Sequence, residues 1–356
     1  MNYKVLSLHE KAEWNEYLSK IHLEEKDIYF TPEYYEIYEK NGEGIAHCFI
    51  YENSKDVALY PFLVNPIKVL GYTLEDEYFD IQSVYGYNGI LTNSFSSNFI
   101  EEFYKSFNAY CLENNIIAEF IRFHPIFNNY RFSINHIQVI FDRKTVALDL
   151  TQTYEDIWQK EYTSNNRNMI RKAEKKGYSC EVISSPTKDQ IDKFSTIYLN
   201  SMNMVGADDY YLFNKDFFYN TYKYLNNYAY LFNIVDVNNE ITSSAIFFHF
   251  GDFFHYHLSG RTEMADNSVN NLLLDEAVKF AKEKGAKIFH LGGGRSSLPD
   301  DSLLKFKSNF SKTKLDFYIG KKIHNQQVYD EVIKQWEEKH PEKKEKYKNY
   351  LLKYRY

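Results

Sequence analysis

The feature that most constrains the fold is a pattern of helix, break and strand that occurs twice along the chain. In the first half, apolar residues at helical spacing run from Phe99 to Leu112, and CLENNIIAEFIRFHP then leads into a strand. In the second half, FAKEKGAKIFHLGGG repeats this order of residue types at an offset of about 170 residues. A strand also precedes each of the two helices. The sequence therefore predicts two mixed α/β (α+β) domains of one topology, over residues 1–150 and 151–320.

The region beyond Gly320 is predicted to form a separate helical tail over residues 321–356. Its first stretch, VYDEVIKQW, is amphipathic, His340-Pro341 interrupts it, and EKKEKYKNYLLKYRY is basic and aromatic. Such a segment either contacts a membrane surface or an RNA backbone, or packs as a helix with one solvated face. Both interpretations stay open at this point.

Charge and composition limit the partners of the chain. Its 356 residues carry a net charge of -7, which argues against broad coating of nucleic acid, so no DNA partner is expected. No run approaches the roughly 18 apolar residues that span a bilayer, and the first residues lack the apolar stretch of a secretory signal. The three cysteines follow no pattern, as in reduced proteins of the cytosol. We therefore expect a cytoplasmic protein, in which a local basic pocket is still compatible with the overall charge.

Common cofactor and metal motifs are missing from the sequence. It contains no GxxxxGK[ST] phosphate loop and no GxGxxG after a strand. Gly292–Gly294 follow a strand but lead into RSSLPDD, so we expect a close backbone approach or a positive-φ turn there. His255, His257 and His290 lie on neighbouring predicted strands without an evident third or fourth ligand of the right geometry. The sequence predicts neither a bound metal nor a cofactor.

One lysine stands beside core positions. In LLKFKSNF, a helix would turn Leu303, Phe306 and Phe310 toward the core and place Lys307 one turn from Leu303. A lysine at the edge of a core can extend its ammonium into water. It can equally place a fixed cation in a cleft that holds a phosphate or a developing oxyanion. The residues alone favour neither role.

A basic stretch, NNRNMIRKAEKKG, contrasts with the acidity of the chain. On a helix, Arg167, Arg171 and Lys175 form one stripe, and Lys172 and Lys176 form the next. The stretch is either a solvated helix face or the boundary of an anionic site for a phosphate-bearing substrate.

A second short stretch, YGYNGI, predicts a tight turn in the first domain. Gly86 and Gly89 allow backbone conformations that other residues adopt at a cost, which leaves Tyr85 and Tyr87 either lining a cleft or plugging a surface turn.

Five motifs in order carry a resemblance to a known family. They are DIQSVYGYNGIL, EFIRFHP, NNRNMIRKAEKKG, VNNLLLDEAVKFAKEKGAKIFHLGGG and LLKFKSNFS. With these motifs the chain resembles, over nearly its whole length, the FemABX-type peptidyl and acyl transferases, which consist of two tandem GNAT-like domains. The resemblance implies transfer of an aminoacyl or acyl group to an amine of a cell-envelope precursor, from peptidoglycan or a surface glycan. It also implies aminoacyl-tRNA or acyl-CoA as donor, no further cofactor, and a possible peripheral contact with the inner membrane surface.

The resemblance also assigns site residues. Lys307 matches the lysine of an F-K-x-x-F motif in the active-site region, and Tyr256 matches a strand tyrosine that lines the cleft; both are expected to be catalytic. The expected substrate-binding residues, taken from the five motifs, are Asp80, Tyr85, Tyr87, Arg167, Arg171, Asn271 and Lys305. Asp80 and Asp275 are also candidates for accepting the proton of the acceptor amine.

Two departures from the family pattern keep alternatives open. Tyr38 stands where some members carry a basic residue that meets the phosphates of the acceptor. GRTEMADNSVNN lacks the glycines with which ordinary GNAT enzymes present backbone amides to a CoA pyrophosphate. The alternatives are a CoA-dependent N-acyltransferase acting on an amino sugar or small amine, and a non-catalytic binding protein of the same fold.

Overall fold

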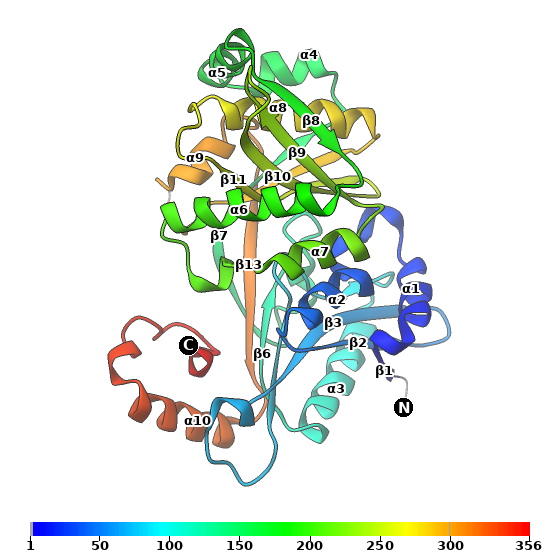
Figure 1. Ribbon diagram of the computed structural model, residues 1–356. Helices are drawn as coiled ribbons and strands as arrows, with labels where there is room; N and C mark the ends of the chain where they lie inside the picture. The colour runs from blue at the N-terminus through cyan, green and yellow to red at the C-terminus, as the bar shows by residue number, and fades with distance from the viewer. Residues whose placement is uncertain (1–2, 299) are drawn as a thin grey trace. The chain divides into compact units, whose positions relative to one another are not determined.

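The computed structural model of the protein describes residues 3–298 and 300–356 (Figure 1). The chain forms two compact units, Met1–Asp142 with Phe317–Tyr356, and Arg143–Asp316. The second unit is therefore inserted into the sequence of the first, which differs from the linear order of two domains and a tail that the sequence suggested. Both units have mixed α/β structure, as predicted.

The first unit contains a six-stranded sheet in the order β1-β2-β3-β4-β6-β13. Its strands are β1 (Tyr3–Ser7), β2 (Ile45–Glu52), β3 (Val57–Pro66), β4 (Phe79–Gln82), β6 (Ile116–Arg122) and the second half of β13 (Lys314–Ile323). A short strand, β5 (Leu91–Thr92), pairs with β3. Neighbouring strands are antiparallel except β4 and β6, which are parallel because α3 connects them.

Helix α3 (Ser97–Glu113) fills one face of this sheet. The side chain of Ser96 caps its first turn by accepting a hydrogen bond from the Phe99 amide. Phe103 and Phe107 follow at helical spacing and are fully buried with aromatic residues of β2 and β3. The other long helices of the unit are α1 (Lys11–Ser19), α2 (Pro32–Lys40) and α10 (Gln326–Lys339).

The predicted tail is an integral part of the first unit. Trp336 of α10 and Tyr354 are buried in one apolar cluster with Ile117 of β6. Tyr329 Oη donates to the carbonyl oxygen of Leu351 at 2.6 Å, which holds the last segment against α10. The amphipathic pattern therefore reflects packing against the unit's own sheet, which is the second of the two interpretations of this sequence.

The second unit contains a sheet in the order β7-β12-β11-β10-β9-β8. Its strands are the second half of β7 (Gln138–Asp149), β12 (Ile288–Gly293), β11 (Phe253–Arg261), β10 (Ile241–Phe250), β9 (Ala229–Val235) and β8 (Ser179–Ile183). Only β11 and β12 are parallel, and α8 (Val269–Glu283) connects them. Each unit thus has one parallel pair joined by a long helix, which is the duplicated element that the sequence predicted.

Helix α8 forms the centre of the second core, where Leu273, Leu274 and Ala277 are fully buried. The remaining helices of this unit are α4 (Tyr154–Asp156), α5 (Ser164–Lys175), α6 (Lys188–Met204), α7 (Lys215–Tyr224) and α9 (Ser302–Lys307). Among the described residues, no helix has the length and apolar character required to cross a membrane. Cys48, Cys111 and Cys180 are free thiols, in agreement with the prediction.

Candidate functional site

The parallel strands β11 and β12 pair only at their first residues. Their register joins Phe253–His255 to Ile288–His290 and ends there. Beyond this point β11 contains a bulge, because Leu258 pairs with Ile246 and Tyr256 with Phe247, which leaves His257 as the additional residue. The side chains that follow on the two strands therefore flank a split in the sheet of the second unit.

Lys307 of α9 lies at this split. Its Nζ donates to the carbonyl oxygen of Gly293 on β12 at 2.8 Å and lies 5.5 Å from the centre of the Tyr256 ring on β11. The residue is only 7% exposed. A lysine that merely extended its ammonium into water would be far more exposed. The burial therefore argues against the first of the two roles considered for Lys307, and the second stays a prediction.

The environment of Lys307 changes its protonation. Burial lowers its pKa from 10.5 to about 7, with a smaller opposing effect of the charge on Asp301. The amine and the ammonium are therefore both populated near neutral pH. Tyr256 lies beside it with its hydroxyl hydrogen-bonded to Ser259 Oγ, and burial raises the pKa of Tyr256, which keeps the phenol protonated.

The glycines Gly292–Gly294 allow the end of β12 to lie close to α9, the helix that contains Lys307. Gly292 has a φ of +76°, and a Cβ on Gly294 would lie 2.3 Å from Asp301 Oδ1. That same oxygen accepts the Leu304 amide at 2.9 Å and so caps α9, the helix that carries Lys307. The run thus has the role expected from the sequence, and it brings β12 and α9 together.

Asn271, assigned to substrate binding, is part of a buried chain of amides. Its Nδ2 donates to Asn166 Oδ1 at 2.7 Å, and Asn166 Nδ2 donates to the carbonyl oxygen of Asn309 at 3.2 Å. Both side chains are nearly inaccessible. These hydrogen bonds connect α8, α5 and the residues that follow α9, so Asn271 stabilises the position of α9 relative to α8.

The two arginines of the basic stretch differ in their use. Arg167 donates to the carbonyl oxygens of Trp158 and Tyr162, at the end of a π-helical turn over Ile157–Glu161. Arg171 is exposed, with its guanidinium 5.3 Å from the centre of the Trp158 ring. The two arginines of the predicted pair therefore differ: Arg167 is half-buried and binds backbone oxygens, whereas Arg171 is exposed. Lys305, on α9, is exposed as well.

Asp80 does not present a carboxylate to a substrate. It is fully buried on β4, where Oδ2 accepts from Tyr354 Oη at 2.8 Å and from Arg355 Nε at 2.7 Å. Asp275 is also fully buried, and accepts from Tyr154 Oη at 2.9 Å and pairs with Lys279 at 2.8 Å. Burial and these partners within their own units argue against the roles suggested for both carboxylates, although Asp80 Oδ1 accepts no hydrogen bond from the residues that the structure describes.

Tyr85 and Tyr87 lie in the expected turn of the first unit. Gly86 has a φ of +105°, and Tyr34 Oη donates to the carbonyl oxygen of Tyr85 at 2.7 Å. Tyr87 packs edge-on against Tyr29. Both tyrosines are partly exposed, so this part of the assignment remains a prediction.

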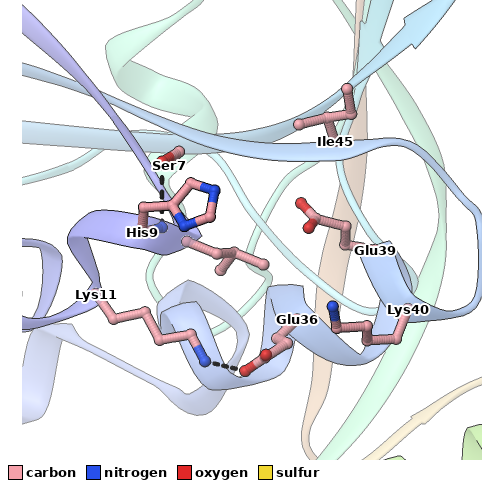
Figure 2. Close-up of a pocket in the computed structure, with 8 residues that line it drawn as sticks. Ser7, His9, Lys11, Glu36, Glu39, Lys40 and Ile45 are labelled. Carbon is pink, nitrogen blue, oxygen red and sulfur yellow. Dashed lines mark hydrogen bonds and ion pairs between the residues drawn. The ribbon is translucent and has the colours of Figure 1, made fainter.

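A pocket of about 310 Å³ occurs elsewhere in the first unit, between β1, α2 and the start of β2 (Figure 2). In it Lys11 and Glu36 form an ion pair, and Glu39 accepts the Ala46 amide at 2.7 Å. None of the predicted site residues lines this pocket. Since the pocket contains none of these residues, we place the candidate site at the split instead.

The histidines lie behind the split. His290 Nε2 is 3.0 Å from Thr145 Oγ1, its ring packs edge-on against His255, and burial lowers the pKa of His257 to about 3. Over residues 3–298 and 300–356, no group of three or more histidine, cysteine or acidic side chains could hold a metal ion.

Sequence reasoning missed two parts of the arrangement. It did not assign Asp301 to the cap of α9, although an acidic residue just before an apolar helical run is the usual signal for one. It also did not identify the Gly293 carbonyl as the partner of Lys307, because a backbone acceptor leaves no mark in the sequence.

Comparisons with known proteins bear on this geometry. Residues 161–307 match the family model of the acetyltransferase (GNAT) domain, a range that ends at Lys307. This match identifies an acyltransferase domain within the second unit. A comparison of the sequence with curated proteins gave no match.

Solved structures with the same fold extend over both units. FemX is 13% identical, with a TM-score of 0.71, over 93% of this chain and 99% of that one. The L-PGS structure from Bacillus licheniformis is 12% identical, with a TM-score of 0.58, over 90% and 94%. A tandem GNAT protein from the clavulanic acid biosynthesis pathway is 7% identical, with a TM-score of 0.51, over 90% and 98%. The predicted tandem GNAT-like fold of the Fem type is confirmed.

Proposed function

We propose that the protein transfers an aminoacyl or acyl group to an amine of a cell-envelope precursor, as a Fem-type acyltransferase. The observation that carries this proposal is the buried Lys307 between β11 and β12, inside the matched acyltransferase domain. The FemX-like fold supports it, as does the similar fold of the L-PGS structure. A cytoplasmic location and a peripheral membrane contact belong to the proposal as expectations.

The reaction requires little covalent chemistry from the protein. The acceptor amine attacks the donor carbonyl, the bond to the leaving group breaks, and the amine loses a proton. The enzyme orients both partners and stabilises the oxyanion that forms in between. Lys307 can accept that proton in its neutral form, because its pKa of about 7 leaves much of it unprotonated at neutral pH. The resulting ammonium then stabilises the negative oxygen, beside the phenol of Tyr256.

Transfer assays with charged tRNA and with acyl-CoA as donors, and amino-sugar or peptide acceptors, test the proposal. We expect Lys307→Met to lower kcat/KM by about 100-fold or more, with circular dichroism unchanged. Lys193→Met is the matched control, because Lys193 is exposed on α6 of the same unit. Full activity of Lys307→Met with a donor on which the unaltered protein is active would contradict the proposed role of this lysine.

A further inference from the structure

The first turn of α8 raises the question of where a donor's phosphates could bind. A helix N-terminus carries partial positive charge and offers amide hydrogens, so it is a ready site for phosphate groups. Helix α8 follows β11, the strand that borders the split, and is 15 residues long. This is the position at which a CoA-dependent enzyme of this fold presents its amides to a pyrophosphate. Whether a pyrophosphate can bind at the start of α8 decides which donors the domain can use.

A carboxylate of the chain already occupies this end of the helix. Asp266 Oδ1 accepts from the Ser268 amide at 2.9 Å and from Ser268 Oγ at 2.5 Å. The carbonyl oxygen of Asp266 accepts the Val269 amide at 3.2 Å, and that of Ser268 accepts the Asn271 amide at 3.1 Å. The amides of Ser268, Val269 and Asn271 are therefore used within the chain, and the negative group near the positive helix end is Asp266 itself.

Two lysines of α5 hold this carboxylate in place. Lys176 Nζ lies 2.5 Å from Asp266 Oδ2, and Lys172 Nζ lies 3.2 Å from Oδ1. The hydrogen bond from Lys176 is the main cause that keeps the pKa of Asp266 well below its usual range. The carboxylate is thus charged at any physiological pH, and its side chain is only 14% exposed. Helix α5 packs on α8, and both lysines pair with Asp266, although their side chains stay about half exposed, 46% for Lys172 and 48% for Lys176.

We infer that Asp266 is a specificity-determining residue, which fills the place of a CoA pyrophosphate at α8 and excludes CoA-bound donors. A bound pyrophosphate would lie beside a fixed negative charge, and it would compete with Asp266 for both lysines and for the Ser268 amide. The loop also lacks glycines that would let its backbone approach phosphate oxygens. If the proposed acyl transfer is correct, the inference implies that the acyl or aminoacyl group of the donor is attached to a carrier other than CoA, and this consequence rests on the proposed function. Its test, however, measures binding alone.

Isothermal titration of the full chain with CoA, and separately with inorganic pyrophosphate, tests this inference. We expect the unaltered protein to bind neither ligand at millimolar concentration. Asp266→Asn keeps an oxygen that can accept from Ser268 but removes the charge and frees the two lysines. This variant should gain pyrophosphate binding at least about tenfold tighter than that of the unaltered protein. Adding Lys172→Met and Lys176→Met to it should abolish the gain.

Asp252→Asn is the matched control, because Asp252 forms an ion pair at 2.9 Å with Lys287, which follows the last residue of α8 rather than its first turn. Asp266→Ser serves as a second variant if Asp266→Asn unfolds. Micromolar binding of CoA by the unaltered protein overturns the inference, and so does an equal gain in Asp266→Asn and Asp252→Asn. Since titration needs no turnover, a failed transfer assay leaves this result intact, and CoA binding leaves the role of Lys307 to be judged separately.

Discussion

Replacing Lys307 by methionine should stabilise the protein at neutral and mildly acidic pH. An unfolded lysine has a pKa near 10.5, whereas burial lowers the pKa of Lys307 to about 7 in the folded chain. The difference of 3.5 units (10.5 − 7) corresponds to about 5 kcal/mol that opposes folding. Methionine is unbranched like lysine, is one heavy atom shorter and carries no charge. It loses the hydrogen bond to Gly293, which offsets about 1 kcal/mol of the gain.

The sign of the pH dependence follows from the protons bound in each state. Below about pH 7 Lys307 is protonated in both the folded and the unfolded chain, so burial of its charge destabilises the folded protein by the full amount. Between pH 7 and 10.5 the unfolded state binds more protons than the folded state, so the stability of the unaltered protein rises with pH. The advantage of Lys307→Met should therefore shrink by about 1.4 kcal/mol per pH unit across this window.

Urea denaturation at pH 6, 7, 8 and 9, followed by circular dichroism, measures this difference directly. Other titrating groups are common to both proteins and cancel when the two curves are subtracted. Lys193→Met provides the control, since an exposed lysine should give a difference that does not vary with pH. Parallel curves for the unaltered protein and Lys307→Met would refute the reasoning, because they would mean that Lys307 remains hydrated and charged when folded.

Three other substitutions probe the remaining contacts. Asp80→Asn leaves Arg355 without its carboxylate and should cost about 3 kcal/mol; chemical denaturation measures it, and a loss equal to that of an exposed aspartate argues against the buried pair. Gly294→Ala should lower both activity and melting temperature, because its Cβ would meet Asp301 Oδ1 at 2.3 Å; normal values for both would contradict the close approach. Asn271→Ala should cost about 1–3 kcal/mol by leaving its amide partner on α5 unsatisfied; a change in KM with stability intact would instead indicate direct contact with substrate.

The duplicated strand–helix–strand element could be predicted from the sequence because its signals are local. Helical spacing in α3 and α8, and the strands that follow them, depend on neighbouring residues alone. The glycines of the YGYNGI turn likewise have the positive φ values that their residue type suggests. Lys307 could be singled out from the sequence, but its burial, which argues against a solvent-directed ammonium, depends on the fold.

Contacts between distant parts of the chain could not be predicted in this way. Asp80 and Arg355 are separated by 275 residues, and no local pattern connects them. Arg167 binds carbonyl oxygens, which every residue possesses and no sequence distinguishes. For the same reason the basic stretch looked like one uniform surface, although the structure assigns different partners to Arg167, Arg171 and Lys176.

The insertion of the second unit into the first has a consequence for synthesis of the chain on the ribosome. When residues 1–142 have emerged, β6 still lacks β13 as its neighbour, and the apolar cluster around Ile117 still lacks Trp336 and Tyr354. The inserted residues 143–316 are complete earlier, because that unit consists of one continuous stretch of the chain. We therefore expect the unit that is second in sequence to finish folding first. A nascent chain stalled before β13 would expose an unpaired sheet edge and an uncovered apolar face, the features that recruit chaperones and favour aggregation.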